Sequence, residues 1–208
     1  MAQFFAVHPD NPQPRLIRRA VEIIRGGGVI VYPTDSCYAL GCRLGDKAAV
    51  ERMRFIRQVD EHHYFTLVCR DLAEIATYAK VDNRQFRLLK ATTPGSYTFI
   101  LQATREVPKR LQHPRRRTVG LRVPDHRVAR ALLDELGEPL LSSTLILPGD
   151  AQPLNDAREI RERLGKLVDL ILDSGSCGIE PTTVVDLSGD TPLIVRAGKG
   201  SSAPFGIE

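Results

Sequence analysis

The stretch Val29-Ile-Val-Tyr-Pro-Thr-Asp35 decides the fold class. Residues 29–32 are a short apolar run rich in β-branched side chains, which is typical of a buried strand. Pro33 cannot donate to a central ladder, so it marks the exit of that strand into a loop. Upstream, residues 16–24 carry apolar side chains at helical spacing, and Gly26 to Gly28 end that helix. A helix followed by a buried strand is the repeating unit of an α/β protein.

Helix and strand patterns continue along the chain. Further helices are predicted at 46–57, from 71, at 126–136 and from 156, and further strands at 65–69, 97–102, 118–123, 140–143, 168–172, 182–187 and 193–195. The stretches 93–123 and 182–196 run from strand to strand without a full helix between them, which favours a mixed, partly antiparallel sheet. No repeat, low-complexity tract or linker interrupts the pattern. The sequence therefore predicts one α/β domain with helices flanking the sheet.

Composition excludes several classes of protein. The 208 residues are 42% hydrophobic and 26% charged, ordinary values for a soluble globular protein. No apolar run approaches the roughly 20 residues of a membrane span, and the first residues lack the pattern of a signal peptide, so we expect a cytoplasmic protein without membrane contact. The four cysteines form no CxxC pair and have no histidine at ligand spacing, so we expect free thiols and no protein-bound metal.

One segment concentrates positive charge. No acidic residue lies between Lys109 and Arg122, and the segment contains Lys109, Arg110, Arg115, Arg116 and Arg117. A run of basic residues is often only part of the solvent-exposed surface. At this density, a binding site for anions or nucleic acid is an equally favoured interpretation.

Two candidate positions follow the first strand. In the loop after Tyr32, hydroxyls and one carboxylate could orient a polar ligand, although the residues alone favour an Asx-type turn in which Asp35 caps its own backbone. Arg57 ends a predicted helix, where the helix dipole alone favours a cation; its functional alternative is a bidentate clamp on phosphate or carboxylate. Phosphate-loop, dinucleotide-binding, zinc-protease and serine-hydrolase motifs are absent.

Three other strand ends carry hydroxyls and arginines. Strand alternation puts Thr118, Gly120 and Arg122 on one face, as in a lined pocket. Residues 141–144 and 181–186 end in hydroxyl-bearing side chains, and Arg196 follows. Few carboxylates accompany these groups, a pattern that suits an anionic substrate.

These segments resemble the YrdC/YciO family, which includes the threonylcarbamoyl-adenylate synthases, and the details are most similar to the YciO branch. The matching stretches are 29–35 with 38–41, 93–101, 119–124, 142–144, and 183–186 with Arg196. They occur in family order from about residue 10 to residue 200, which we expect to be one YrdC-like domain without a separate C-terminal domain.

The resemblance implies a twisted open mixed sheet around a large, basic, concave cleft. In synthase members, that cleft condenses threonine, bicarbonate and ATP with Mg²⁺ into threonylcarbamoyl-AMP and pyrophosphate, for the N6-modification of adenosine in tRNA. Family members also bind double-stranded RNA or tRNA. The resemblance therefore implies ATP, threonine and bicarbonate as ligands, and double-stranded RNA, tRNA or rRNA as partners.

Site residues follow from the same resemblance. It implies threonine contacts from Thr34, Arg122 and Thr182, with Cys69 and Ser142 beside them. It implies nucleotide contacts from Arg57, Thr118, Thr144 and Arg196. The basic run Lys109, Arg110, Arg115, Arg116 and Arg117 is the expected RNA-binding segment.

The chain departs from the synthase pattern at named positions. The KxR signature is Phe55-Ile56-Arg57 here, and the SxN signature is Thr144-Leu145-Ile146. Tyr64 stands near an expected asparagine, and Cys69 takes the place of a histidine in the threonine pocket. We therefore expect weak or altered synthase activity; the alternatives are a non-catalytic RNA-binding protein of the translation machinery and a hydrolase of a related adenylate. His62 and His63, in an apparent insertion at 59–63, are expected to be surface histidines.

Overall fold

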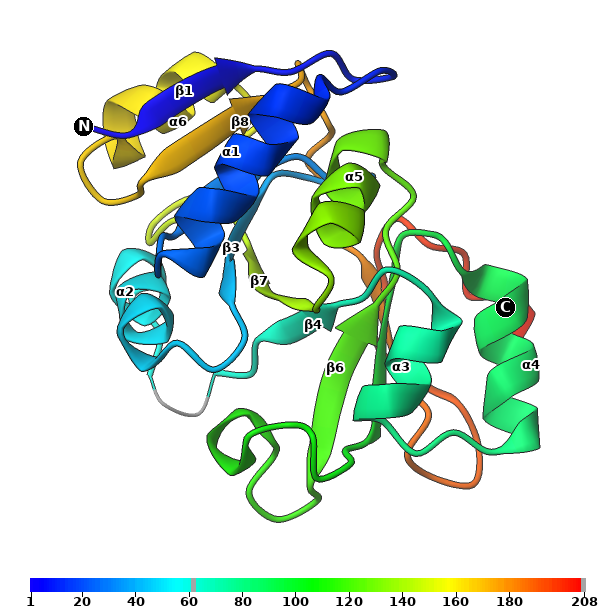
Figure 1. Ribbon diagram of the computed structural model, residues 1–208. Coiled ribbons are helices and arrows are strands. Elements are labelled where there is room, and N and C mark those ends of the chain that lie inside the picture. Colours follow the sequence, from blue (N-terminus) through cyan, green and yellow to red (C-terminus); the bar gives the residue numbers. More distant parts are fainter. Residues whose placement is uncertain (61–62, 207–208) are drawn as a thin grey trace.

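The helix and strand predicted around residues 16–32 are confirmed as α1 (Pro14–Arg25) and β2 (Ile30–Tyr32). They belong to a computed structural model, which describes residues 1–60 and 63–206 (Figure 1). Pro14 occupies the start of α1, where the missing N–H would have no helical partner in any case. The apolar face of α1 is buried, so the helix is held mainly by packing.

The remaining elements follow in chain order. The other helices are α2 (Lys47–Arg57), α3 (Leu72–Tyr78), α4 (Asn83–Thr92), α5 (Arg127–Leu136) and α6 (Ala157–Leu164), with short 3₁₀ turns η1 (Lys109–Leu111) and η2 (Ala203–Phe205). The other strands are β1 (Gln3–Ala6), β3 (Ala39–Arg43), β4 (Thr66–Val68), β5 (Tyr97–Gln102), β6 (Thr118–Arg122), β7 (Leu140–Thr144), β8 (Leu170–Asp173), β9 (Thr183–Asp186) and β10 (Leu193–Arg196).

The strands form one sheet in the order β1-β8-β2-β3-β7-β4-β6-β5-β9-β10. The pairs β1–β8, β2–β8, β4–β6 and β5–β9 are parallel, whereas β2–β3, β3–β7, β4–β7, β5–β6 and β9–β10 are antiparallel. The prediction of an α/β fold with a mixed, open sheet is confirmed.

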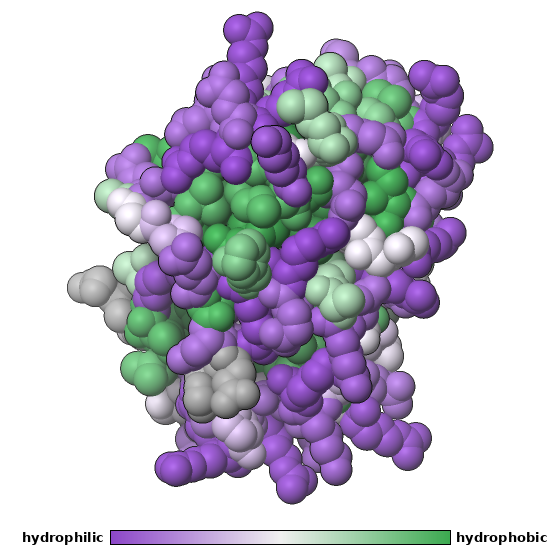
Figure 2. All heavy atoms as spheres, turned by 90° about the vertical axis from the view of Figure 1, so that its left-hand side faces the viewer, coloured by the Kyte–Doolittle hydropathy of each residue, from purple (hydrophilic) through white to green (hydrophobic). Residues whose placement is uncertain are grey.

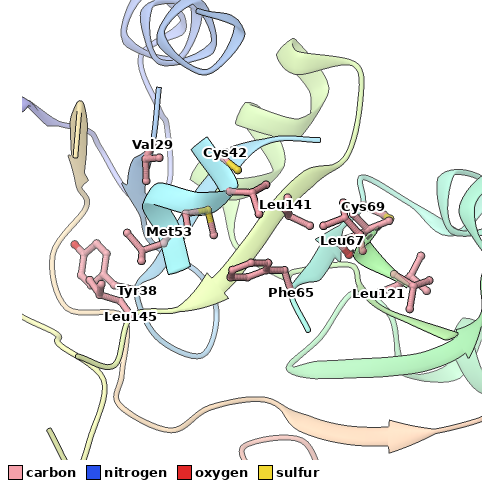
Figure 3. Close-up of a cluster of buried hydrophobic side chains, with 14 of the residues drawn as sticks. Val29, Tyr38, Cys42, Met53, Phe65, Leu67, Cys69, Leu121, Leu141 and Leu145 are labelled. Carbon is pink, nitrogen blue, oxygen red and sulfur yellow. Dashed lines mark hydrogen bonds between the residues drawn. The ribbon is translucent and has the colours of Figure 1, made fainter. Parts of the chain in front are cut away.

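Apolar side chains of β2 alternate between two core layers. Ile30 and Tyr32 belong to the layer under α1 and α5, which lie side by side in Figure 1. Val31 belongs to the other layer, together with Met53 of α2. Figure 3 shows part of this second layer, in which Met53 lies near Leu141 of β7. Burial on both faces explains the uninterrupted apolar run of β2.

Two of the described strands and one α-helix were not expected from the sequence. Residues 39–41 are predicted to lie in a loop but begin β3, and neither β1 nor α4 is predicted. The start of α4 does carry a signal: Asp82 and Gln85 form a capping box, in which each side chain accepts from the backbone N–H of the other residue.

Hydrophilic side chains cover much of the outer surface in one view of the molecule (Figure 2). Figure 2 shows the face that lies on the left in Figure 1, where hydrophilic side chains surround a central hydrophobic area. Within residues 1–60 and 63–206, no helix is long and apolar enough to span a membrane.

Candidate functional site

A pocket of about 360 Å³ lies against the middle strands of the sheet. Its wall includes side chains of β4, β5, β6, β7 and β9, with Arg57 from the last turn of α2 and Arg196 from the end of β10. Four arginines line it, and none of its described lining residues is acidic. The pocket is therefore suited to an anion.

Eight of the nine residues expected to contact small ligands line this pocket. They are Thr34, Arg57, Thr118, Arg122, Ser142, Thr144, Thr182 and Arg196. They come from segments as far apart in the chain as the β2–β3 loop and the end of β10. The structure brings these residues together, and which ligand each contacts stays a prediction.

The ninth residue, Cys69, does not line the pocket. It is fully buried in the second core layer with Leu67 (Figure 3), whereas Thr66 and Val68 face the pocket. The Cys69 thiol is 3.9 Å from the Leu67 carbonyl oxygen, and burial raises its pKa well above the ordinary value. Because side chains alternate along a strand, Cys69 had to share the face of Leu67.

The loop after β2 is closed by a hydroxyl. The Thr34 Oγ1 accepts from the backbone N–H groups of Ser36 and Cys37, both at 3.2 Å, and donates to the Cys37 carbonyl at 2.6 Å. The predicted turn capped by Asp35 is therefore wrong: Thr34 makes the capping contacts. The Asp35 carboxylate accepts instead from the Ser96 hydroxyl at 2.7 Å.

Asp35 also forms a buried ion pair with Arg122. The Nη2 of Arg122 is 2.5 Å from the Asp35 Oδ1, and each side chain is only 9% exposed. The Nη1 of Arg122 lies 3.3 Å from the Ser36 hydroxyl. Its buried Nε has no hydrogen-bond partner within the described parts of the chain. Arg122 is thus neutralised by Asp35, and among the described residues its Nε is left unpaired in the interior.

Two other arginines bond to backbone oxygens. Arg57 donates to the Ile146 carbonyl, and its buried Nε has no hydrogen-bond partner among the described residues. Burial lowers the pKa of Arg57. Arg196 donates from Nη2 to the Thr182 carbonyl at 2.8 Å. No carboxylate of residues 1–60 or 63–206 forms an ion pair with Arg57 or Arg196.

Arg116, from the predicted RNA-binding segment, also lines the pocket. It forms an ion pair with Asp186 at 2.8 Å, so the compensating acid lies 70 residues away in sequence. Burial alone would raise the pKa of Asp186, but hydrogen bonds from Ser188 and Arg116 outweigh it and the pKa is lowered. All five members of the segment are exposed; the other four are Lys109, Arg110, Arg115 and Arg117.

The wall of the pocket also includes His63, Tyr64 and His113. Tyr64 is the residue near the expected asparagine, whereas neither histidine was expected in the pocket. His63 is half-buried at this pocket, and His62 lies outside the described residues. Burial, followed by the nearby Arg57 and Arg54, lowers the pKa of His63, while Asp60 acts in the opposite direction. His63 is consequently neutral near pH 7. Across the described parts of the chain, no group of three or more potential metal ligands occurs.

Gly198 allows the end of the chain to approach the pocket wall. A Cβ at this position would lie 2.3 Å from the Pro181 oxygen and 2.7 Å from the Thr182 oxygen. Gly198→Ala should therefore push the segment that carries Arg196 outward and lower the free energy of unfolding by about 1–3 kcal/mol in urea denaturation.

The matched control is Gly189→Ala, because a Cβ added at residue 189 would meet no heavy atom within 4 Å and the backbone there is not left-handed. We expect that variant to unfold within about 0.5 kcal/mol of the parent protein. Equal unfolding midpoints for the two alanine variants would contradict the close approach at Gly198.

Comparison with known proteins gives a consistent assignment. The family model named Sua5_yciO_yrdC, described as "Telomere recombination", matches residues 22–198. The protein YciO of Escherichia coli, itself described as uncharacterized, is 58% identical over 99% of this chain and 100% of its own length. A threonylcarbamoyl-AMP synthase of Chromobacterium violaceum is 35% identical over 89% of this chain and 95% of its own.

Solved structures show the same fold. The crystal structure of E. coli YciO superimposes with a TM-score of 0.95, covering 99% of this chain and 100% of that one. The crystal structure of P. abyssi Sua5 complexed with L-threonine has a TM-score of 0.86 at 24% identity, and covers 94% of this chain and 57% of that one.

Proposed function

The chain belongs to the family of Sua5, YciO and YrdC proteins, and on this premise we propose that its pocket binds ATP and a small amino acid such as threonine. We further propose that it resembles threonylcarbamoyl-AMP synthase with weak or altered activity, and that its exposed basic segment binds RNA. The observation that carries the proposal is the lining of the pocket, with four arginines and no acidic side chain among the described residues. Polyphosphate is the anion that such a concentration of guanidinium groups suits.

The nucleotide phosphates would lie along Arg57 and Arg196. Both guanidinium groups are held by backbone carbonyls, which orient them without neutralising their charge. Thr118 is the first residue of β6 and Thr144 is the last residue of β7. Both would offer hydroxyls to the same ligand. Mg²⁺ would arrive with the nucleotide and neutralise part of the phosphate charge.

The amino acid would lie near Thr34, Arg122, Ser142 and Thr182. Arg122 lines the pocket, and its guanidinium group would face the carboxylate of this ligand. The Ser142 hydroxyl donates to the Leu40 carbonyl at 2.9 Å, so it accepts from the Tyr32 hydroxyl at 2.7 Å. These contacts hold the wall of the pocket in place before a ligand binds.

Weak activity follows from the departures from the synthase signatures. Phe55, at the position of the signature lysine, is 71% exposed and is not part of the described pocket lining. Ile146 lines the pocket at the position of the signature asparagine. At residue 146 the pocket therefore lacks a polar contact that would stabilise charge on the phosphates during adenylyl transfer, whereas residue 55 lies outside the described lining.

Titration calorimetry with ATP and Mg²⁺, followed by a pyrophosphate-release assay, tests this proposal. We expect ATP binding and slow pyrophosphate release that requires both threonine and bicarbonate. Absence of ATP binding would overturn the proposal. ATP binding without pyrophosphate release would leave the alternatives, a non-catalytic RNA-binding protein or a hydrolase of a related adenylate, and hydrolysis of threonylcarbamoyl-AMP would distinguish these two.

The RNA part of the proposal rests on Lys109, Arg110, Arg115, Arg116 and Arg117. Phosphate contacts release counterions, so affinity for double-stranded RNA or tRNA should fall steeply with added salt. An affinity that is flat between low and physiological salt would contradict binding through this segment.

Restoring the asparagine gives a sharper test of the pocket. Ile146→Asn adds an amide to the lining, and one neutral hydrogen bond to the nucleotide should raise ATP affinity by about 2- to 10-fold in calorimetry. Phe55→Lys places its cation on a solvent-facing position and should change the affinity little. A gain from Phe55→Lys alone would mean that residue 55 reaches the nucleotide.

A further inference from the structure

Tyr64 and His113 form a stacked pair at the pocket. Their ring centroids are 5.1 Å apart with an interplanar angle of 19°. The two residues come from different loops, one before β4 and one before β6, and both line the pocket. Tyr64 is 45% exposed, so part of this stacked pair remains accessible to a planar ligand.

The loop of His113 holds this ring and the exposed arginines as one unit. The Nδ1 of His113 accepts from the backbone N–H groups of Arg115 at 3.2 Å and Arg116 at 3.1 Å. The N–H of Arg117 donates to the His113 carbonyl at 2.8 Å, and Arg117 adopts a left-handed backbone with φ of 52°. The position of the ring is therefore coupled to the positions of Arg115 and Arg117.

Unpaired cations lie next to this stacked pair in the chain. Of the pocket arginines, Arg122 and Arg116 are paired with Asp35 and Asp186, respectively, whereas Arg57 and Arg196 have no carboxylate partner among the described residues. Arg115 and Arg117 are exposed and form no ion pair with a described residue. The accessible aromatic surface is thus adjacent in the chain to two unbalanced cations outside the pocket.

We propose that Tyr64 and His113 are a stacking platform for an unpaired base of RNA, whose flanking phosphates contact Arg115 and Arg117. This inference rests on the proposed function, because it uses the same basic segment and adds that the RNA bound there is unpaired. Bases stack on aromatic side chains irrespective of sequence, and the strand phosphates follow neighbouring cations. Within a duplex, both faces of an internal base are already covered, so the platform selects single-stranded RNA over duplex.

Fluorescence anisotropy with a labelled single-stranded RNA and a duplex of the same length tests the platform. The protein should bind the single strand more tightly than the duplex. Tyr64→Ala should weaken binding of the single strand by about 5- to 150-fold and leave duplex binding nearly unchanged. Tyr64→Phe keeps the ring and should retain the affinity.

Phe86→Ala is the matched control, because Phe86 is 46% exposed on α4 and does not line the pocket. It should leave binding of the single strand unchanged. Urea unfolding of each variant should show that the fold is retained, and Tyr64→Leu provides a second non-aromatic side chain at that position.

The outcomes separate this inference from the proposed function. Equal wild-type affinity for single strand and duplex, or no effect of Tyr64→Ala, overturns the platform. A loss of ATP affinity in Tyr64→Ala as large as the loss of RNA affinity also overturns it, because the ring would then hold the base of the free nucleotide. Absence of ATP binding with Tyr64-dependent binding of single-stranded RNA overturns the nucleotide proposal and leaves the platform supported.

Discussion

Replacing Asp35 with alanine should lower the free energy of unfolding by about 3–5 kcal/mol, because Arg122 would remain buried without its counter-charge. Both side chains of this pair are 9% exposed, so water cannot replace the lost carboxylate easily. The Ser96 hydroxyl would lose its acceptor in the same variant. Urea denaturation monitored by circular dichroism measures the change.

Two companion variants make this result specific. Asp35→Ala combined with Arg122→Met removes both charges and should regain most of the lost stability. Glu22→Ala breaks an exposed pair with Arg19, whose side chains are 62% and 55% exposed, respectively, and should cost less than about 1 kcal/mol. An equal loss in Asp35→Ala and Glu22→Ala would show that the Arg122 pair is screened by solvent.

Replacing Arg57 with alanine should weaken ATP binding by about 10- to 150-fold, the equivalent of about 1.5–3 kcal/mol. Arg57 is bound to the Ile146 carbonyl, and no described carboxylate forms an ion pair with it. Its charge is therefore available to a phosphate. Arg57→Lys keeps the charge but loses the planar fork, so its loss of affinity in calorimetry should be smaller.

Lys47→Ala is the matched control for charge. It removes one positive charge from the exposed first position of the same helix, and Lys47 does not line the pocket. We expect nearly unchanged ATP affinity. A similar loss in Lys47→Ala and Arg57→Ala would mean that overall electrostatic attraction, rather than a contact from Arg57, determines the affinity.

Local patterns in the sequence predicted most of the fold. The apolar spacing of α1, the capping carboxylates of Asp46, Asp71 and Asp156, and Gly137 at the end of α5 depend on neighbours within a few residues. β3 was not predicted because its residues, some of them small, show no clear apolar pattern. They are buried because β3 pairs with β2 and β7. A strand of this kind is recognisable only once its partners are placed.

The site was predicted less completely, because its interactions join distant residues. Asp35 looked like the cap of a local turn, but its partner Arg122 lies 87 residues away and competes for the same carboxylate. The sequence likewise shows no acidic residue near Arg116. In the structure, Asp186 at the end of β9 forms the ion pair with it. The alternation of β6 correctly placed Thr118, a residue that lines the pocket, on the face of Arg122.

The order of strands in the sheet has a consequence for synthesis on the ribosome. β5 pairs with β9, and the pocket needs Thr182 and Arg196 beside residues as early in the chain as Thr34. A chain that emerges from its N-terminus can form α1 and β2 early, but its pocket wall is completed only after Arg196 has left the exit tunnel. Until then, the edge of β5 that pairs with β9 awaits a strand that has yet to be translated, so nascent chains of this protein should acquire ligand affinity only after Arg196 has emerged.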